Sequence, residues 1–171
     1  IVHSYRQSFF KDKNSYSLAS VRAGNVIGGG DWAENRIVPD CIKSLKENKP
    51  VIIRNPAAIR PWQHVLEPLG GYLMLAGKML DAPENYNEPW NFGPSYNGAK
   101  TVFDLVDEVV KCWGTGSFKI EKQINRNLET GFLKLDISNA RHRLKWSPVL
   151  SFVDSIKLAV NWYKAQESGV D

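Results

Sequence analysis

The chain has 171 residues, of which 43% are hydrophobic and 23% charged, so it can bury one hydrophobic core and is too short for two. Its formal net charge is +4, but the basic residues lie among acidic ones, which argues against a nucleic-acid partner and suits a small anion. The first ten residues are amphipathic rather than continuously apolar, so we expect neither a signal peptide nor a membrane span.

The predicted elements alternate between strands and helices, which indicates an α/β fold. In chain order we expect the end of a helix at 1–10, a strand at 17–23, a glycine-rich loop at 24–35, a helix at 36–47, a strand at 51–53, an extended segment at 60–65, a helix at 67–80, a strand at 90–92, and helices at 101–113, 138–144 and 151–166. Thr101, Ser138 and Ser151 are the predicted N-caps of the last helices. These few short strands cannot close a sheet, and the chain begins at Ile1 without a methionine, so we expect part of a larger fold that starts inside a helix.

The two cysteines indicate a reducing compartment. Cys41 and Cys112 lie far apart, and neither has a spacing typical of metal ligands. We therefore expect two buried thiols, no metal site and a cytoplasmic protein.

The run from Arg22 to Trp32 carries a short apolar strand into a glycine-rich loop with one polar amide, Asn25. Ligands of open α/β sheets bind beyond the carboxyl ends of the strands, where glycines let the backbone approach closely. Asn25 is therefore a candidate ligand contact. The alternative is that its side chain only ties a turn, a common role for asparagine.

Four motifs together carry a resemblance to a known family, and they are Arg22-Ala-Gly-Asn-Val-Ile-Gly-Gly-Gly-Asp-Trp32, Arg60-Pro-Trp-Gln-His-Val-Leu-Glu-Pro68, Trp90-Asn-Phe-Gly-Pro94 and Leu133-Lys-Leu-Asp136. The chain resembles the CDP-glucose 4,6-dehydratases, extended short-chain dehydrogenase/reductases that act on nucleotide sugars. The resemblance runs from Ile1 to about Lys164.

The resemblance implies a two-part, homo-oligomeric enzyme with a Rossmann domain that holds NAD and a smaller part that holds CDP-glucose. Residues 1–35 would be the remnant of the Rossmann domain, and residues 36–171 would be mainly the nucleotide-sugar part, with strand and helix returns to the Rossmann part. The glycine fingerprint for NAD and the catalytic Tyr-x-x-x-Lys pair would precede Ile1, so we expect no catalytic residue here and no activity of this chain alone.

The family reaction removes a hydride from C4 of the glucose to NAD, eliminates water across C5 and C6, and returns the hydride to C6. Its product, CDP-4-keto-6-deoxyglucose, is a precursor of the deoxysugars of O-antigen lipopolysaccharide.

Three features of the sequence could be mistaken for catalytic or cofactor-binding residues. Tyr96 and Lys100 have the catalytic spacing, but they lie in turn-rich sequence rather than on one helical face. The cluster Gly28–Gly30 has the wrong spacing for the NAD fingerprint, so we expect it to shape the substrate loop. His64 has no neighbouring carboxylate or cysteine cluster, and we expect it to serve the fold.

Site residues carry over from the family by position. The resemblance implies cofactor contacts at Ala23, Gly24 and Asn25, and substrate contacts at Asn25, Arg36, Ile37, Val51, Ile53, Arg54, Arg60, Asn91 and Arg126. The backbone of the first two would run beside the nicotinamide, and Asn25 would contact the sugar diphosphate. Arg60 is the strongest candidate, since a guanidinium suits bidentate phosphate recognition.

Each assignment has a structural alternative. Arg36 at a helix start opposes the helix dipole, which indicates an anionic ligand or an ion pair with Asp31 or Glu34. The strand residues Val51 and Ile53 alternate in direction and can equally be core. Arg60 can form a structural ion pair, and the amide of Asn91 can cap a turn.

One position departs from the family pattern, because Leu128 stands beside Glu129 where the family carries a histidine. Arg126 is a candidate replacement contact to phosphate. The alternative functions are a non-catalytic nucleotide-sugar-binding module and a related nucleotide-sugar epimerase or reductase.

Overall fold

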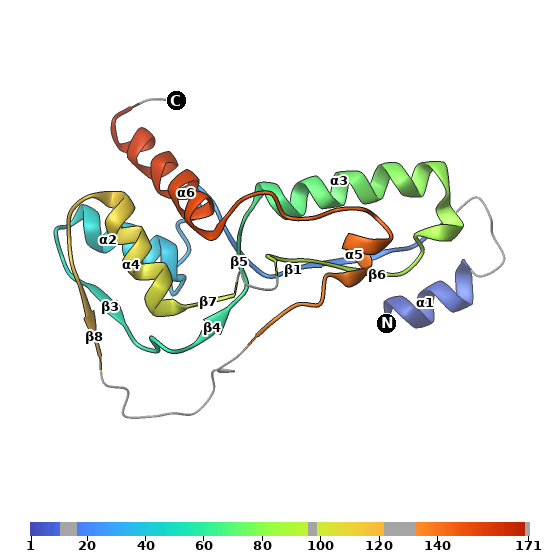
Figure 1. Cartoon of the computed structure of the whole chain (residues 1–171), viewed down its shortest axis with the longest axis horizontal. Coiled ribbons are helices and arrows are strands. Elements are labelled where there is room, and N and C mark those ends of the chain that lie inside the picture. The colour runs from blue at the N-terminus through green and yellow to red at the C-terminus, as the bar shows by residue number, and fades with distance from the viewer. Residues whose placement is uncertain (11–16, 96–98, 122–132, 170–171) are drawn as a thin grey trace.

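The computed structural model describes residues 1–10, 17–95, 99–121 and 133–169, which form an elongated α/β arrangement (Figure 1). The helices are α1 (Val2–Phe9), α2 (Ile37–Lys46), α3 (Leu66–Asp81), α4 (Val102–Trp113), α5 (Ser138–His142) and α6 (Phe152–Glu167), with a 3-10 turn η1 (Pro83–Asn85). The strands are β1 (Ser20–Ala23), β2 (Asn25–Ile27), β3 (Val51–Ile53), β4 (Ile59–Arg60), β5 (Trp62–His64), β6 (Pro89–Phe92), β7 (Lys100–Thr101) and β8 (Phe118–Ile120).

The described strands form four separate pairs rather than one sheet. β1 lies parallel to β6, and β2 lies parallel to β5 with Asn25 opposite Trp62. β3 lies parallel to β8, whereas β4 and β7 are antiparallel. Parallel strands joined through helices are typical of α/β folds, so the predicted fold class is confirmed.

Buried side chains form two hydrophobic clusters, one at each end of the molecule. The larger cluster joins α2, α4 and α6 to β3 and includes the fully buried Ile42, Leu105 and Ile156 (Figure 1). The smaller cluster joins β6 to α3 and α5 around Trp90 and Phe92. β6 also pairs with β1, so residues 89–92 lie beside residues 20–23.

Most predicted helices and two of the three predicted caps are confirmed. Thr101 and Asp104 form a reciprocal capping box at the start of α4, and Ser151 Oγ accepts a hydrogen bond from the Asp154 N–H at the start of α6. The predicted cap at Ser138 is wrong, because Ser138 is already helical. Its N–H instead donates to Asp136 Oδ1 at 2.8 Å, and hydrogen bonds from Ser138 lower the pKa of Asp136.

The loop predicted over residues 24–35 is partly wrong, since residues 25–27 form β2. β2 pairs with β5, and a backbone hydrogen bond from the Val65 N–H to the Ile27 carbonyl continues the pairing. The structure also contains β7 and β8, which the sequence pattern did not predict. Strands of two or three residues are too short for alternation to be visible.

The two cysteines differ in burial. Cys41 is fully buried in the larger cluster, where burial raises its pKa to about 12, whereas Cys112 is only half-buried, so the second half of the expectation is wrong. Neither thiol forms a disulfide.

None of the described helices has both the length and the apolar content needed to cross a membrane.

Candidate functional site

A cavity of about 1130 Å³ lies where the ends of β1 and β2 approach α2, β3 and β4. Eight of the predicted site residues line it, and they are Ala23, Gly24, Asn25, Arg36, Ile37, Val51, Arg54 and Arg60. They come from four separate stretches of sequence, which the fold brings to one place.

One face of α2 forms a wall of this cavity. Asp40, Lys43 and Ser44 line it, and together with Arg36 at the N-cap they follow the helical period. The opposite face of α2 carries Cys41, Ile42 and Leu45, which anchor the helix in the larger cluster. Hydrophobic periodicity therefore fixes which polar side chains of α2 face the cavity.

Asn25 sits at the start of β2, not in a turn. Its N–H donates to the Pro61 carbonyl at 3.0 Å, so its backbone belongs to the pairing with β5. Gly24 precedes it where a Cβ would lie 2.6 Å from the Pro61 carbonyl oxygen. Only glycine allows the segments around Gly24 and Pro61 to approach this closely, and this approach places Asn25 at the edge of the cavity.

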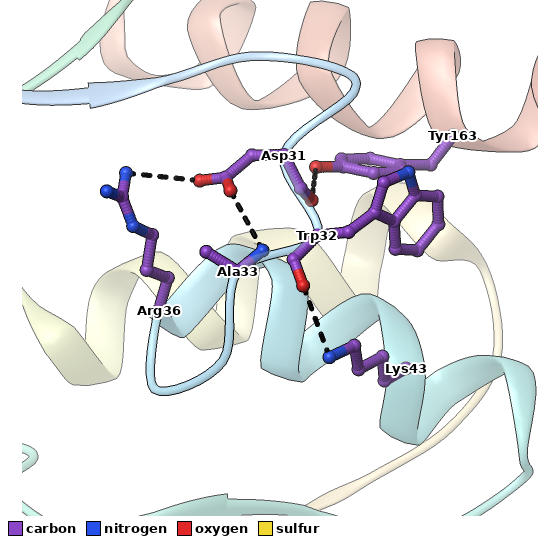
Figure 2. Close-up of polar contacts among 6 residues, drawn as sticks. All are labelled: Asp31, Trp32, Ala33, Arg36, Lys43 and Tyr163. Atoms are coloured by element: carbon purple, nitrogen blue, oxygen red, sulfur yellow. Dashed lines mark hydrogen bonds and ion pairs between the residues drawn. The ribbon is translucent and has the colours of Figure 1, made fainter.

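The segment from Asp31 to Arg36 is tied down by polar contacts (Figure 2). Asp31 accepts a hydrogen bond from the Ala33 N–H at 3.0 Å and pairs with Arg36 at 3.3 Å. Lys43 Nζ donates to the Trp32 carbonyl at 3.4 Å. The expected ion pair between Arg36 and Asp31 is therefore present, but the Arg36 side chain is 65% exposed, so this pair contributes little stability.

α6 holds the same segment through Tyr163. The Tyr163 hydroxyl donates to the Asp31 carbonyl at 2.7 Å, and its ring packs edge to face against Trp32. Tyr163 is fully buried, and burial raises the pKa of its hydroxyl, which remains a donor at neutral pH.

The Tyr163→Phe substitution is expected to lower the free energy of unfolding by about 1 kcal/mol, because it removes this hydrogen bond and leaves the ring in place. Urea unfolding of the intact protein measures the loss. Tyr5→Phe is the matched control, since Tyr5 is 51% exposed, and it should change stability by less than about 0.5 kcal/mol. Equal stabilities of the two variants would show that the bond to Asp31 contributes nothing.

The glycine cluster serves packing as well as the loop. A Cβ at Gly29 would lie 2.1 Å from Cγ of Trp162, and Gly30 has φ of +78°. These glycines let α6 lie against the loop, and α2 begins only at Ile37. No helix start follows the cluster directly, so it cannot seat a pyrophosphate in the manner of the NAD fingerprint.

Arg60 and Arg54 line the cavity from the segment that carries β3 and β4. Arg60 is half-buried, and its Nη1 donates to the Ile59 carbonyl at 2.9 Å. Arg54 is exposed just after β3. With Arg36 and Lys43, these residues give the cavity four basic side chains from the described part of the chain.

Three predicted residues are not placed in the cavity. Ile53 is fully buried in the larger cluster, whereas its neighbours Val51 and Ile52 line the cavity. Asn91 accepts from Arg22 at 3.4 Å and donates to the Asp136 carbonyl at 3.0 Å, contacts that tie β6 to its neighbours. Arg126 lies outside the described residues, as do Leu128, Glu129 and Tyr96.

His64 packs into the fold. It is buried, its Nδ1 accepts from the Leu66 N–H at 3.4 Å, and burial lowers its pKa against the opposing effect of Glu67. The Glu67 carboxylate accepts hydrogen bonds from the Val149 and Leu150 N–H groups. The described residues contain no group of three or more His, Cys, Asp or Glu side chains that could hold a metal ion.

Sequence patterns missed several cavity residues, namely Asp40, Lys43, Ser44, Ile52 and Trp62. The signal for the residues of α2 was present, since a predicted amphipathic helix also predicts its polar face. No sequence signal showed that this polar face would meet a cavity rather than solvent.

The comparisons with known proteins bear on this geometry. No family model matches the chain. A curated CDP-glucose 4,6-dehydratase from Salmonella typhimurium is 45% identical over 175 aligned residues, which cover 100% of this chain. This confirms the resemblance to CDP-glucose 4,6-dehydratase. The chain spans 49% of the length of that curated relative.

Solved structures share the fold at low sequence identity. A dTDP-glucose 4,6-dehydratase from Streptomyces venezuelae with NAD bound gives a TM-score of 0.78 at 17% identity, covering 98% of this chain and 48% of its own. A UDP-glucose-4-epimerase from Stenotrophomonas maltophila with NAD and formylated UDP-arabinopyranose gives 0.78 at 16% identity, covering 98% and 54%. The chain therefore has the fold of about half of each of these two structures.

Two residues that the resemblance places beside the cofactor, Ala23 and Gly24, line the cavity. The space beside Gly24 is filled by Pro61, so Gly24 could meet a cofactor only through its backbone. A glycine loop leading directly into a helix, the usual seat for a dinucleotide pyrophosphate, is absent from the described residues.

Proposed function

We propose that the intact protein is an NAD-dependent CDP-glucose 4,6-dehydratase and that residues 1–171 supply its nucleotide-sugar site. The identity of 45% to the curated dehydratase over the whole chain carries this proposal. The cavity supports it, because eight residues expected from the resemblance line one space beside basic side chains.

In this proposal the basic residues hold the diphosphate. Arg60 and Arg36 come from separate elements and line one cavity, so they can contact an anion from different directions. The pair of Arg36 with Asp31 uses only the Nη1 nitrogen of an exposed guanidinium, so its other N–H groups can donate to a phosphate oxygen. Asn25, at the strand ends, contacts the sugar diphosphate. Placement of this kind lowers the barrier by holding the reacting atoms together.

We further propose that the acid-base residues lie outside residues 1–171, as a Tyr-x-x-x-Lys pair of the intact protein. NAD, when bound, supplies the reversible hydride store for the reaction. Ala23 and Gly24 then offer backbone beside the nicotinamide, and the cavity orients the sugar toward it. By the same resemblance we propose a cytoplasmic homo-oligomer that makes precursors of lipopolysaccharide O-antigen sugars.

Turnover tests the proposed function. The intact protein, incubated with CDP-glucose and NAD, is expected to convert the sugar nucleotide to a product lighter by one water, with no net reduction of NAD. Mass spectrometry of the nucleotide and absorbance of the cofactor measure both. An unchanged mass with binding of CDP-glucose would instead indicate a non-catalytic module, and a product of unchanged mass but altered sugar configuration would indicate an epimerase.

The epimerase is kept as the second candidate because an epimerase structure matches with a TM-score of 0.78. At 16% identity that match supports the fold but says nothing of the reaction, so the dehydratase, with a relative at 45% identity, is the better-supported proposal.

A further inference from the structure

One carboxylate that lines the cavity, that of Asp40, has no hydrogen-bonding or ionic partner among the described residues. Asp40 lines the cavity from α2, where it is half-buried, and within the described part of the chain its carboxylate forms no hydrogen bond and no ion pair. The two cations nearest in sequence on the same helix face are engaged elsewhere, Arg36 with Asp31 and Lys43 with the Trp32 carbonyl (Figure 2).

An unpaired carboxylate repels phosphate, so Asp40 is unsuited to the diphosphate end of the cavity. It lies one helical turn past Arg36, about 6 Å further along the axis, and Ser44 lies about 6 Å beyond it on the same face. Along the cavity, α2 thus presents the basic Arg36, then the acceptor Asp40 and then the hydroxyl of Ser44, while Lys43 between the last two donates to the Trp32 carbonyl.

β3, which packs against α2, contributes aliphatic side chains to the cavity wall, and Arg54 and Asn55 follow them. Ile52 of β3 lines the same cavity with 46% of its surface exposed, next to Val51. An exposed aliphatic surface beside hydrogen-bonding groups suits a flat heterocycle, which buries its face and pairs at its edge.

The edge of cytosine matches the groups on α2. Cytosine presents an exocyclic N4 amine, a donor that carboxylates accept, whereas uracil and thymine present a carbonyl oxygen at the same position. A carboxylate therefore attracts the first base and repels the other two. A serine hydroxyl can donate to the O2 carbonyl, which all three pyrimidines share.

We infer that Asp40 accepts a hydrogen bond from the N4 amine of cytosine and thereby selects CDP-sugars over UDP- and dTDP-sugars, with Ser44 as a non-selective contact to O2. This inference rests on the proposed function, because it assumes that the cavity binds a pyrimidine nucleotide.

Calorimetric titration of the intact protein with CDP and with UDP tests the inference. The wild type is expected to prefer CDP. Asp40→Asn can either accept from N4 or donate to O4, so it should reduce the ratio of the CDP and UDP affinities by about tenfold or more. Ser44→Ala should weaken both nucleotides and leave their ratio unchanged.

Asp107→Asn is the charge-matched control, since Asp107 pairs with Lys111 on α4 and does not line the cavity. It should preserve the wild-type ratio. A wild-type ratio in folded Asp40→Asn would overturn the role of Asp40, and a changed ratio in Ser44→Ala would overturn the non-selective role of Ser44; either result leaves the proposed function intact. A folded wild type that binds neither nucleotide would overturn both.

Discussion

Replacing Arg60 with alanine in the intact protein is expected to weaken binding of CDP-glucose by about 1.5–3 kcal/mol, roughly tenfold to more than a hundredfold. Arg60 lines the cavity from β4, half-buried, where its guanidinium meets less solvent than at the surface. A hydrogen bond to a charged group in such a place contributes more than an exposed one. Calorimetric titration with CDP-glucose measures the loss.

Two further variants show whether the effect belongs to the guanidinium. Arg60→Lys keeps the positive charge but cannot form bidentate hydrogen bonds, so its affinity for CDP-glucose should fall between those of the wild type and Arg60→Ala. Arg22→Ala removes an exposed arginine that contacts Asn91 outside the cavity, and it should bind CDP-glucose as the wild type does. If Arg60→Ala keeps full affinity while its fold is intact, the diphosphate is bound elsewhere.

Replacing Trp90 with alanine is expected to lower the free energy of unfolding by about 3–5 kcal/mol. Trp90 is fully buried at the centre of the smaller cluster, and its Nε1 donates to the Tyr86 carbonyl at 3.0 Å. The substitution removes a large apolar surface, leaves a void and removes one of the two hydrogen bonds that the Tyr86 carbonyl accepts, the other coming from the Glu88 N–H. Chemical denaturation followed by circular dichroism measures the change.

Leu80→Ala provides the contrast, because Leu80 is a large apolar residue that is 87% exposed on α3. Its stability should change by less than about 0.5 kcal/mol. Trp90→Ala should also release β6 from its place beside β1, since Trp90 lies opposite Val21 in that pair. A Trp90→Ala protein as stable as Leu80→Ala would contradict the assignment of a second core.

The helices were predictable because their signals are local. Apolar residues at helical spacing fixed α2, and the Thr101 and Asp104 pair fixed the start of α4. Strands of two or three residues lack enough length to show alternation, so β7 and β8 were missed and β2 was taken for loop. These strands exist because of partners distant in sequence, which no local pattern reveals.

The site was predictable to the extent that motifs mark it. The motifs around Asn25 and Arg60 led to residues that the fold brings into one cavity, although β2 and β4 are separated by more than 30 residues of sequence. The sequence does not show which residues of β3 reach the cavity, because this depends on packing against the larger cluster, in which Ile53 is fully buried while Ile52 lines the cavity. Asp40 was missed because its importance lies in what it lacks, a partner, and that is visible only in three dimensions.

A crystal structure of the intact protein with CDP-glucose and NAD tests the central claim most directly. We expect the nucleotide to lie in the cavity between α2, β3 and β4, with the Arg60 guanidinium on the diphosphate and the glucose at the ends of β1 and β2. A nucleotide sugar bound away from this cavity, or bound in it with the diphosphate remote from Arg60, would contradict it.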